Sequence, residues 1–154
     1  MEFTCPRWVQ LPQIALYMDQ VLLVLNQALE PLTSAEAPAV TSTMINNYVK
    51  MKLAAPAEKK KYDRDHMARF LMICLLKKVL SMTEIAAVLE ELLQERPLEA
   101  AYDLFCRELE LRLSNLEGPD SGDCPPVLAA AIRAVASKIA VEKLLAAQTA
   151  EQEA

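Results

Sequence analysis

The sequence predicts an all-α protein, and three observations favour this class. Its 154 residues are 53% hydrophobic but only 5% aromatic, a mixture typical of packed helices rather than of sheets. Only two glycines are present, so the Gly-rich phosphate loops of many nucleotide-binding proteins have almost nowhere to form. Apolar residues also recur at spacings of three and four along much of the chain, which is the helical period.

The first third of the chain predicts two helices. Residues 1–12 hold two prolines and predict an irregular lead-in. Residues 14–29 repeat apolar side chains at helical spacing and predict a helix that ends at the next proline. A shorter helix starts after Thr41 or Ser42, because either hydroxyl can cap a free amide, and runs to about Leu53.

The middle of the chain predicts a basic loop and two more helices. Residues 54–61 have no apolar face and predict a loop or a minimal wing. Asp63 caps a third helix that is apolar all round over residues 70–76 and must therefore be covered on several sides. Ser81 and Glu84 have the spacing of a capping box and start the fourth helix.

Two further helices complete the predicted fold. Pro97 suits the first turn of a fifth helix, whose apolar residues form one seam up to Leu116 while its acids and arginines face out. The cluster of Gly, Pro, Ser and Asp at 118–126 marks a break. A sixth helix follows, with apolar residues in one stripe over 128–139.

Charge is strongly segregated along the chain. The net charge of −5 would ordinarily argue against nucleic acid. However, residues 41–80 hold nine of the 16 basic residues and three of the 21 acidic ones, a local net charge of +6. A surface that attracts polyanions can therefore survive on an acidic protein.

The order of these segments suggests a winged helix-turn-helix. A short polar helix over 43–50 precedes the basic loop and two apolar helices. A helix that reads a DNA groove must be short, polar on one face and rigidly backed, and flanking lysines grip phosphates to fix its register.

Residues in this region also resemble the second half of the MerR-type DNA-binding domain. Those that carry the resemblance are Tyr62-Asp63, Met67, Arg69-Phe70, Ile73, Leu76, Leu80-Ser81-Met82 and Glu84-Ile85. The resemblance implies phosphate contacts at Lys60 and Tyr62. It also implies that a groove-facing helix carries Thr43, Asn46, Asn47 and Tyr48.

A second resemblance covers roughly residues 12 to 95. The phrases Leu16-Tyr17-Met18-Asp19-Gln20, Met44-Ile45-Asn46-Asn47-Tyr48-Val49-Lys50 and Lys60-Lys61-Tyr62 are similar to the bacterial family called domain of unknown function 1836. This resemblance implies a helix-turn-helix-like fold and no settled activity. We expect a MerR-like winged helix-turn-helix of about four helices over residues 1–95, followed by a helical pair for oligomerisation over 96–154.

The predicted nucleic-acid interface has a simpler alternative at each position. A lysine run can be merely solvated, and a tyrosine can back a helical core. Adjacent asparagines point about 100° apart on a helix, so at most one of them is expected to face a groove. The predicted contact residues are Thr43, Asn46, Asn47, Tyr48, Lys50, Lys52, Lys59, Lys60, Lys61, Tyr62 and Arg69.

Other classes of function find less support. The four cysteines have no paired short spacing, so the sequence predicts neither a zinc site nor a disulfide framework. His66, the single histidine, is expected to be a surface or capping group. No enzyme is predicted. No cofactor or metal is expected, and no leader or membrane span, which favours a cytoplasmic protein. The expected function is a DNA-binding transcriptional regulator, dimeric through residues 98–145. The alternative is a helical interaction or dimerisation module without DNA binding.

Overall fold

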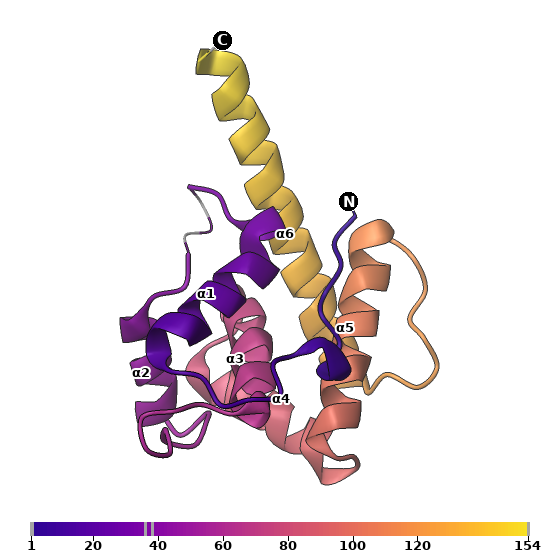
Figure 1. Ribbon diagram of the computed structural model, residues 1–154. Coiled ribbons are helices and arrows are strands. Elements are labelled where there is room, and N and C mark those ends of the chain that lie inside the picture. The colour runs from indigo at the N-terminus through magenta and orange to yellow at the C-terminus, as the bar shows by residue number, and fades with distance from the viewer. Residues whose placement is uncertain (1, 36, 38, 154) are drawn as a thin grey trace.

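The computed structural model describes residues 2–35, 37 and 39–153, and these fold into six α-helices (Figure 1). The described residues contain three isolated bridges but no strand, so the all-α prediction is confirmed. The helices are α1 (Met18–Leu29), α2 (Ser42–Lys50), α3 (Arg64–Leu76), α4 (Met82–Gln94), α5 (Leu98–Ser114) and α6 (Pro126–Glu153), with short 3-10 turns η1 (Trp8–Gln10) and η2 (Glu30–Leu32).

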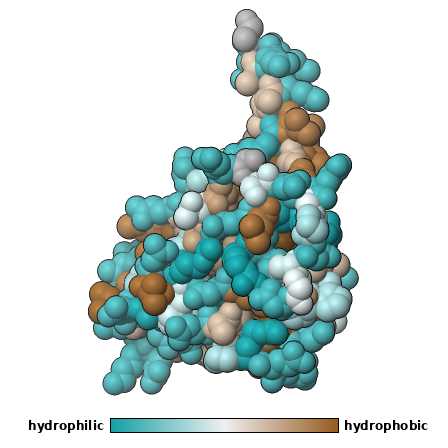
Figure 2. All heavy atoms as spheres, turned by 90° about the vertical axis from the view of Figure 1, so that its right-hand side faces the viewer, coloured by the Kyte–Doolittle hydropathy of each residue, from teal (hydrophilic) through white to brown (hydrophobic). Residues whose placement is uncertain are grey.

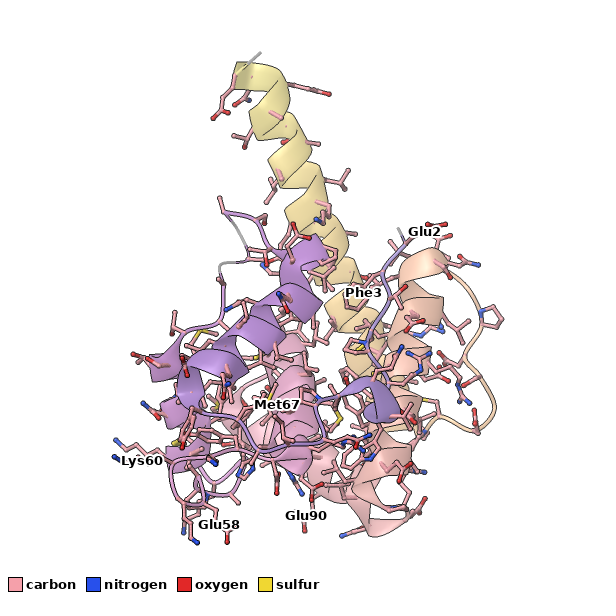
Figure 3. The ribbon with its side chains drawn as sticks, viewed as in Figure 1. Glu2, Phe3, Glu58, Lys60, Met67 and Glu90 are labelled. Carbon is pink, nitrogen blue, oxygen red and sulfur yellow. The ribbon has the colours of Figure 1, made fainter. Side chains whose placement is uncertain are left out.

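Helix α3 is the centre of the molecule. Nine of its 13 residues are buried, and α1, α5 and α6 pack against it; Met67 marks its place in the interior in Figure 3. The prediction that this helix is covered on several sides is confirmed. One hydrophobic cluster extends from Phe3 to Ile139. The expected boundary after residue 95 therefore does not separate two cores.

The ends of the first two helices differ from expectation. Helix α1 begins at Met18, four residues later than predicted, and Ile14 is 71% exposed. Helix α2 is capped as predicted, since the Thr41 hydroxyl accepts a hydrogen bond from the Met44 amide at 3.3 Å. It ends at Lys50 rather than near Leu53, because Lys52 adopts a left-handed conformation.

The N-terminal lead-in is fastened to α5. The amide of Cys5 donates to Glu110 Oε2 at 3.1 Å, and the Tyr102 hydroxyl donates to the Pro6 carbonyl at 2.6 Å. The sulfur atoms of Cys5 and Cys106 are 2.9 Å apart, in a buried contact between free thiols. Sequence spacing alone gave no sign of this pair, because 101 positions separate its members.

The prediction that the charged residues of α5 face out is wrong for two of them. Glu108 and Arg112 are both buried. The Arg112 guanidinium donates to the carbonyls of Asn115, Leu116 and Gly118. These are acceptors that a helix end and the loop after it would otherwise leave unpaired, so burial of this charge is compensated by hydrogen bonds.

The cap of α3 gives a prediction with a defined pH dependence. Asp63 Oδ1 accepts from the His66 amide at 3.0 Å. Burial alone would raise the pKa of Asp63, but the hydrogen bonds from His66 outweigh it and hold the pKa below its ordinary value. Asp63→Ala should therefore cost about 1 kcal/mol of unfolding free energy at pH 7, measured by urea denaturation.

The same cost should shrink as the pH falls below about 4, because a carboxylate with a depressed pKa stabilises the fold above its unfolded pKa and loses this contribution once protonated. Asp65→Ala, in the first turn of the same helix, is the matched control and should cost less. A cost for Asp63→Ala that does not change with pH would contradict the assignment.

Candidate nucleic-acid interface

Helix α2 presents a polar stripe to solvent. Thr43, Asn46, Asn47 and Lys50 are all exposed and follow each other at i, i+3, i+4 and i+7, so they lie on one face. The opposite face carries the buried Ile45 and Tyr48. Both asparagines are exposed and lie at opposite edges of one broad stripe, so the prediction that at most one of them faces a groove stays a prediction.

Directly after α2, a lysine holds a position that usually belongs to glycine. Lys52 has φ of 63°, and the amides of Lys52 and Leu53 donate to the carbonyls of Val49 and Tyr48. This pattern is the Schellman motif, in which the left-handed residue is most often Gly. The backbone of Lys52 is consequently fixed at the end of the polar stripe.

The basic loop contains a tight hairpin turn with two lysines at its tip. Glu58 and Lys61 exchange two backbone hydrogen bonds of 2.9 Å. Between them Lys59 and Lys60 have φ of 52° and 66°, which is a two-residue turn of type I′, normally occupied by Asn-Gly. Figure 3 shows Lys60 projecting outward from this turn, beside the lower end of α2.

Hydrogen bonds anchor the basic loop on both sides of this turn. His66 Nε2 donates to the Ala55 carbonyl at 3.0 Å, while its Nδ1 lies 2.8 Å from Asp63 Oδ1 and 3.1 Å from the Asp63 amide nitrogen. On the other side, Tyr62 and Leu16 exchange two backbone hydrogen bonds of 2.8 Å. His66 is thus a capping residue as expected, but it is buried rather than on the surface. A lone histidine in an apolar helix was the signal available in the sequence.

Five cations beside α2 and the basic loop form no ion pair, side-chain hydrogen bond or ring contact within the described part of the chain, unlike Lys61 and Arg64. Of these, Lys50, Lys52 and Arg69 line one shallow hollow of about 560 Å³ together with Pro56. Lys59 and Lys60 lie on the hairpin turn, which follows Pro56 by a few residues in the chain. We call this set the basic surface; it consists of Lys50, Lys52, Lys59, Lys60 and Arg69.

Two tyrosines expected to contact nucleic acid lie in the core instead. The side chains of Tyr48 and Tyr62 are 2% and 7% exposed. Tyr62 packs edge-on against His66 and Phe70, with ring centroids 5.2 and 5.6 Å away. This corrects the contact assignment for both tyrosines: they support α2 and the loop from behind.

Other cations of the segment are engaged or distant. Lys61 Nζ lies 5.1 Å from the centroid of the Tyr17 ring, and Arg64 donates to the Leu11 carbonyl at 3.2 Å. Lys77 and Lys78 follow the C-terminal end of α3, about 20 Å along its axis from the end where the basic loop is held. The local charge of +6 is therefore divided between two places.

No cluster of three or more His, Cys, Asp or Glu side chains able to hold a metal is found among the described residues. In the same part of the chain, no helix combines the length and the hydropathy needed to cross a bilayer.

Fold and site together define a class of small all-α proteins in which a short polar helix and a lysine-bearing turn are fixed on a buried central helix. The family model for Domain of unknown function (DUF1836) matches residues 6–105, and the chain belongs to this family. Neither the curated proteins nor the solved structures give a match.

The lysines at the tip of the turn should lower stability. A left-handed conformation costs about 1–2 kcal/mol for a residue with a Cβ, and less for Asn or Gly. The double substitution Lys59→Asn and Lys60→Gly should therefore raise the unfolding free energy by about 1 kcal/mol. Urea denaturation measures this change.

Lys50→Gln is the control for the loss of positive charge, because Lys50 is exposed on α2 and has a helical backbone. It should leave the unfolding free energy nearly unchanged. A double variant no more stable than the parent would argue against the strained turn.

Proposed function

We propose that this protein is a DNA-binding transcriptional regulator. The observation that carries the proposal is that its described residues with positive φ are all lysines of one segment, Lys52, Lys59 and Lys60. Each occupies a position where Gly or Asn is favoured on backbone grounds. Strained backbone concentrates at functional sites, and here the strained positions carry exposed cations.

In this proposal α2 enters the major groove. The stripe of Thr43, Asn46 and Asn47 offers side chains that can bond base edges, and an Asn can pair with adenine through two hydrogen bonds. The basic surface contacts phosphates on either side and fixes the register of the helix. Fastening of the loop by His66 and Tyr62 supports this role, because a fixed loop loses little entropy on binding.

The proposed arrangement is MerR-like. The chain order of reading helix, turn and two apolar helices matches that type of domain, and the type I′ turn serves as a wing reduced to its tip. Helix α1 packs on α3 and would replace the helix that usually comes directly before the reading helix.

DNA affinity should fall steeply with salt. Four or five contacts between the basic surface and phosphates give a slope of log affinity against log salt of about −4. Fluorescence anisotropy of labelled genomic fragments, starting at low ionic strength, measures this slope. The Lys59→Asn, Lys60→Gly variant should reduce its magnitude by about 2, even though the variant is the more stable protein.

Lys77→Gln removes a base from the other end of α3 and should leave the slope unchanged. A slope near zero in the parent protein, or no binding to DNA at low salt, would contradict the proposal. Capture of an acidic protein in a complex resistant to nuclease would then favour the interaction module instead.

We also propose that the regulator is a homodimer through α6. This 28-residue helix extends beyond the body of the molecule in Figure 1, and Figure 2 shows hydrophobic atoms on its projecting part. One exposed stripe alternates spacings of three and four, the heptad pattern of helices that pair with a copy of themselves. The stripe consists of Val127, Ala130, Ala134, Ser137, Val141, Leu144 and Gln148.

Sedimentation at micromolar concentration should give a species of twice 17.1 kDa. Leu144 is 66% exposed, and Leu144→Glu should convert the dimer to a monomer because a carboxylate cannot be buried unpaired in the seam. Leu23→Glu, at a residue 59% exposed on α1, is the control and should remain dimeric. A parent protein of 17.1 kDa in solution would contradict the dimer.

A further inference from the structure

A cavity lies on the inner side of α2, away from the basic surface. Its volume is about 280 Å³, near the lower end of the range for small-molecule sites. Helices α1, α2, α3 and α6 all contribute to its wall, as does the connection after α1. Apolar side chains form a large part of that wall, among them Leu29, Met44 and Leu75.

One residue of the cavity wall carries an unsatisfied polar group. Tyr48 lines the cavity and is 2% exposed, and its buried hydroxyl has no hydrogen-bond partner of normal geometry; the thiol of Cys74, a weak hydrogen-bonding group, lies beside it. Burial, and to a lesser degree the neighbouring Cys74 thiol, raises the pKa of Tyr48, so the hydroxyl keeps its proton and can donate it. Buried hydroxyls are usually paired because an unmade hydrogen bond is costly. An acceptor supplied by a ligand would pair this one.

The charges on the wall select an anion. Lys78 and Glu142 form a buried ion pair of 2.7 Å on one side of the cavity. Lys77 and Lys138 also line it and make no ion pair within the described residues. Three bases and one acid leave the wall with a net charge of +2.

We propose that this cavity binds a small organic acid with one carboxylate and an apolar body. The carboxylate accepts a hydrogen bond from the Tyr48 hydroxyl and balances the charge of Lys77 and Lys138. The body of the ligand lies against Leu29, Met44 and Leu75. The carboxylate thus meets the polar and charged groups of the wall, and the apolar body meets its apolar side chains.

The location would let such a ligand influence DNA binding and dimerisation. Met44 and Tyr48 belong to α2, and Lys138 belongs to α6, so one molecule would contact both the proposed reading helix and the proposed dimerisation helix. A ligand shifts an equilibrium when it binds one state better than another. Binding itself is independent of the proposed DNA-binding function and is tested without DNA.

Titration calorimetry of the full chain tests the site with the sodium salts of butanoate, hexanoate, octanoate and decanoate. At least one should bind with a Kd below about 1 mM. Octanol and octylamine keep an apolar body but replace the anionic head, and each should bind at least about tenfold more weakly than octanoate. Absence of binding by all four acids, or equal binding of octanol and octylamine, overturns the proposal.

Two variants locate the ligand. Tyr48→Phe removes only the unpaired hydroxyl and should weaken binding about tenfold, while the thermal midpoint of the free protein rises by about 3 °C. Tyr17→Phe removes an exposed hydroxyl outside the cavity and is the matched control. Lys138→Gln, at an exposed position, should weaken octanoate binding about fivefold. Unchanged affinity in both Tyr48→Phe and Lys138→Gln overturns the proposal.

Discussion

Burial of α3 on several sides is the constraint on which the rest of the structure depends. Its first turns hold His66 and Phe70 against Tyr62, and this contact fixes the basic loop. Its last turn places Cys74 and Leu75 in the wall of the cavity. Because α1, α5 and α6 all pack against α3, segments far apart in the chain lie together at its two ends.

The basic surface combines charge with backbone strain. A left-handed backbone conformation is unfavourable for lysine, and Lys52, Lys59 and Lys60 all adopt it. A fold selected for stability alone would place Gly or Asn there. This mismatch between residue type and backbone conformation is the basis of the proposed phosphate contacts. The anchored loop fixes the backbone from which these lysines project.

Local signals in the sequence predicted local structure well. Thr41, Asp63 and Ser81 each cap the helix that their spacing indicated, because a cap needs only the few residues around it. The signals failed where a side chain's environment comes from distant segments. Tyr48 belongs to a polar helix yet faces inward, and Arg112 sits on an amphipathic helix yet is buried among loop carbonyls.

The sequence by itself determined the helical class, the capped starts of α2, α3 and α4, the apolar centre of α3 and the segregation of charge, since composition, capping and period act within a few residues. Only the tertiary structure decided which cations share a surface. It separated Lys77 and Lys78 from the basic surface, brought the thiols of Cys5 and Cys106 into contact, and buried the hydroxyl of Tyr48, a residue in the wall of a cavity. The physical reason is that packing around α3 sets distances between residues that no local spacing constrains.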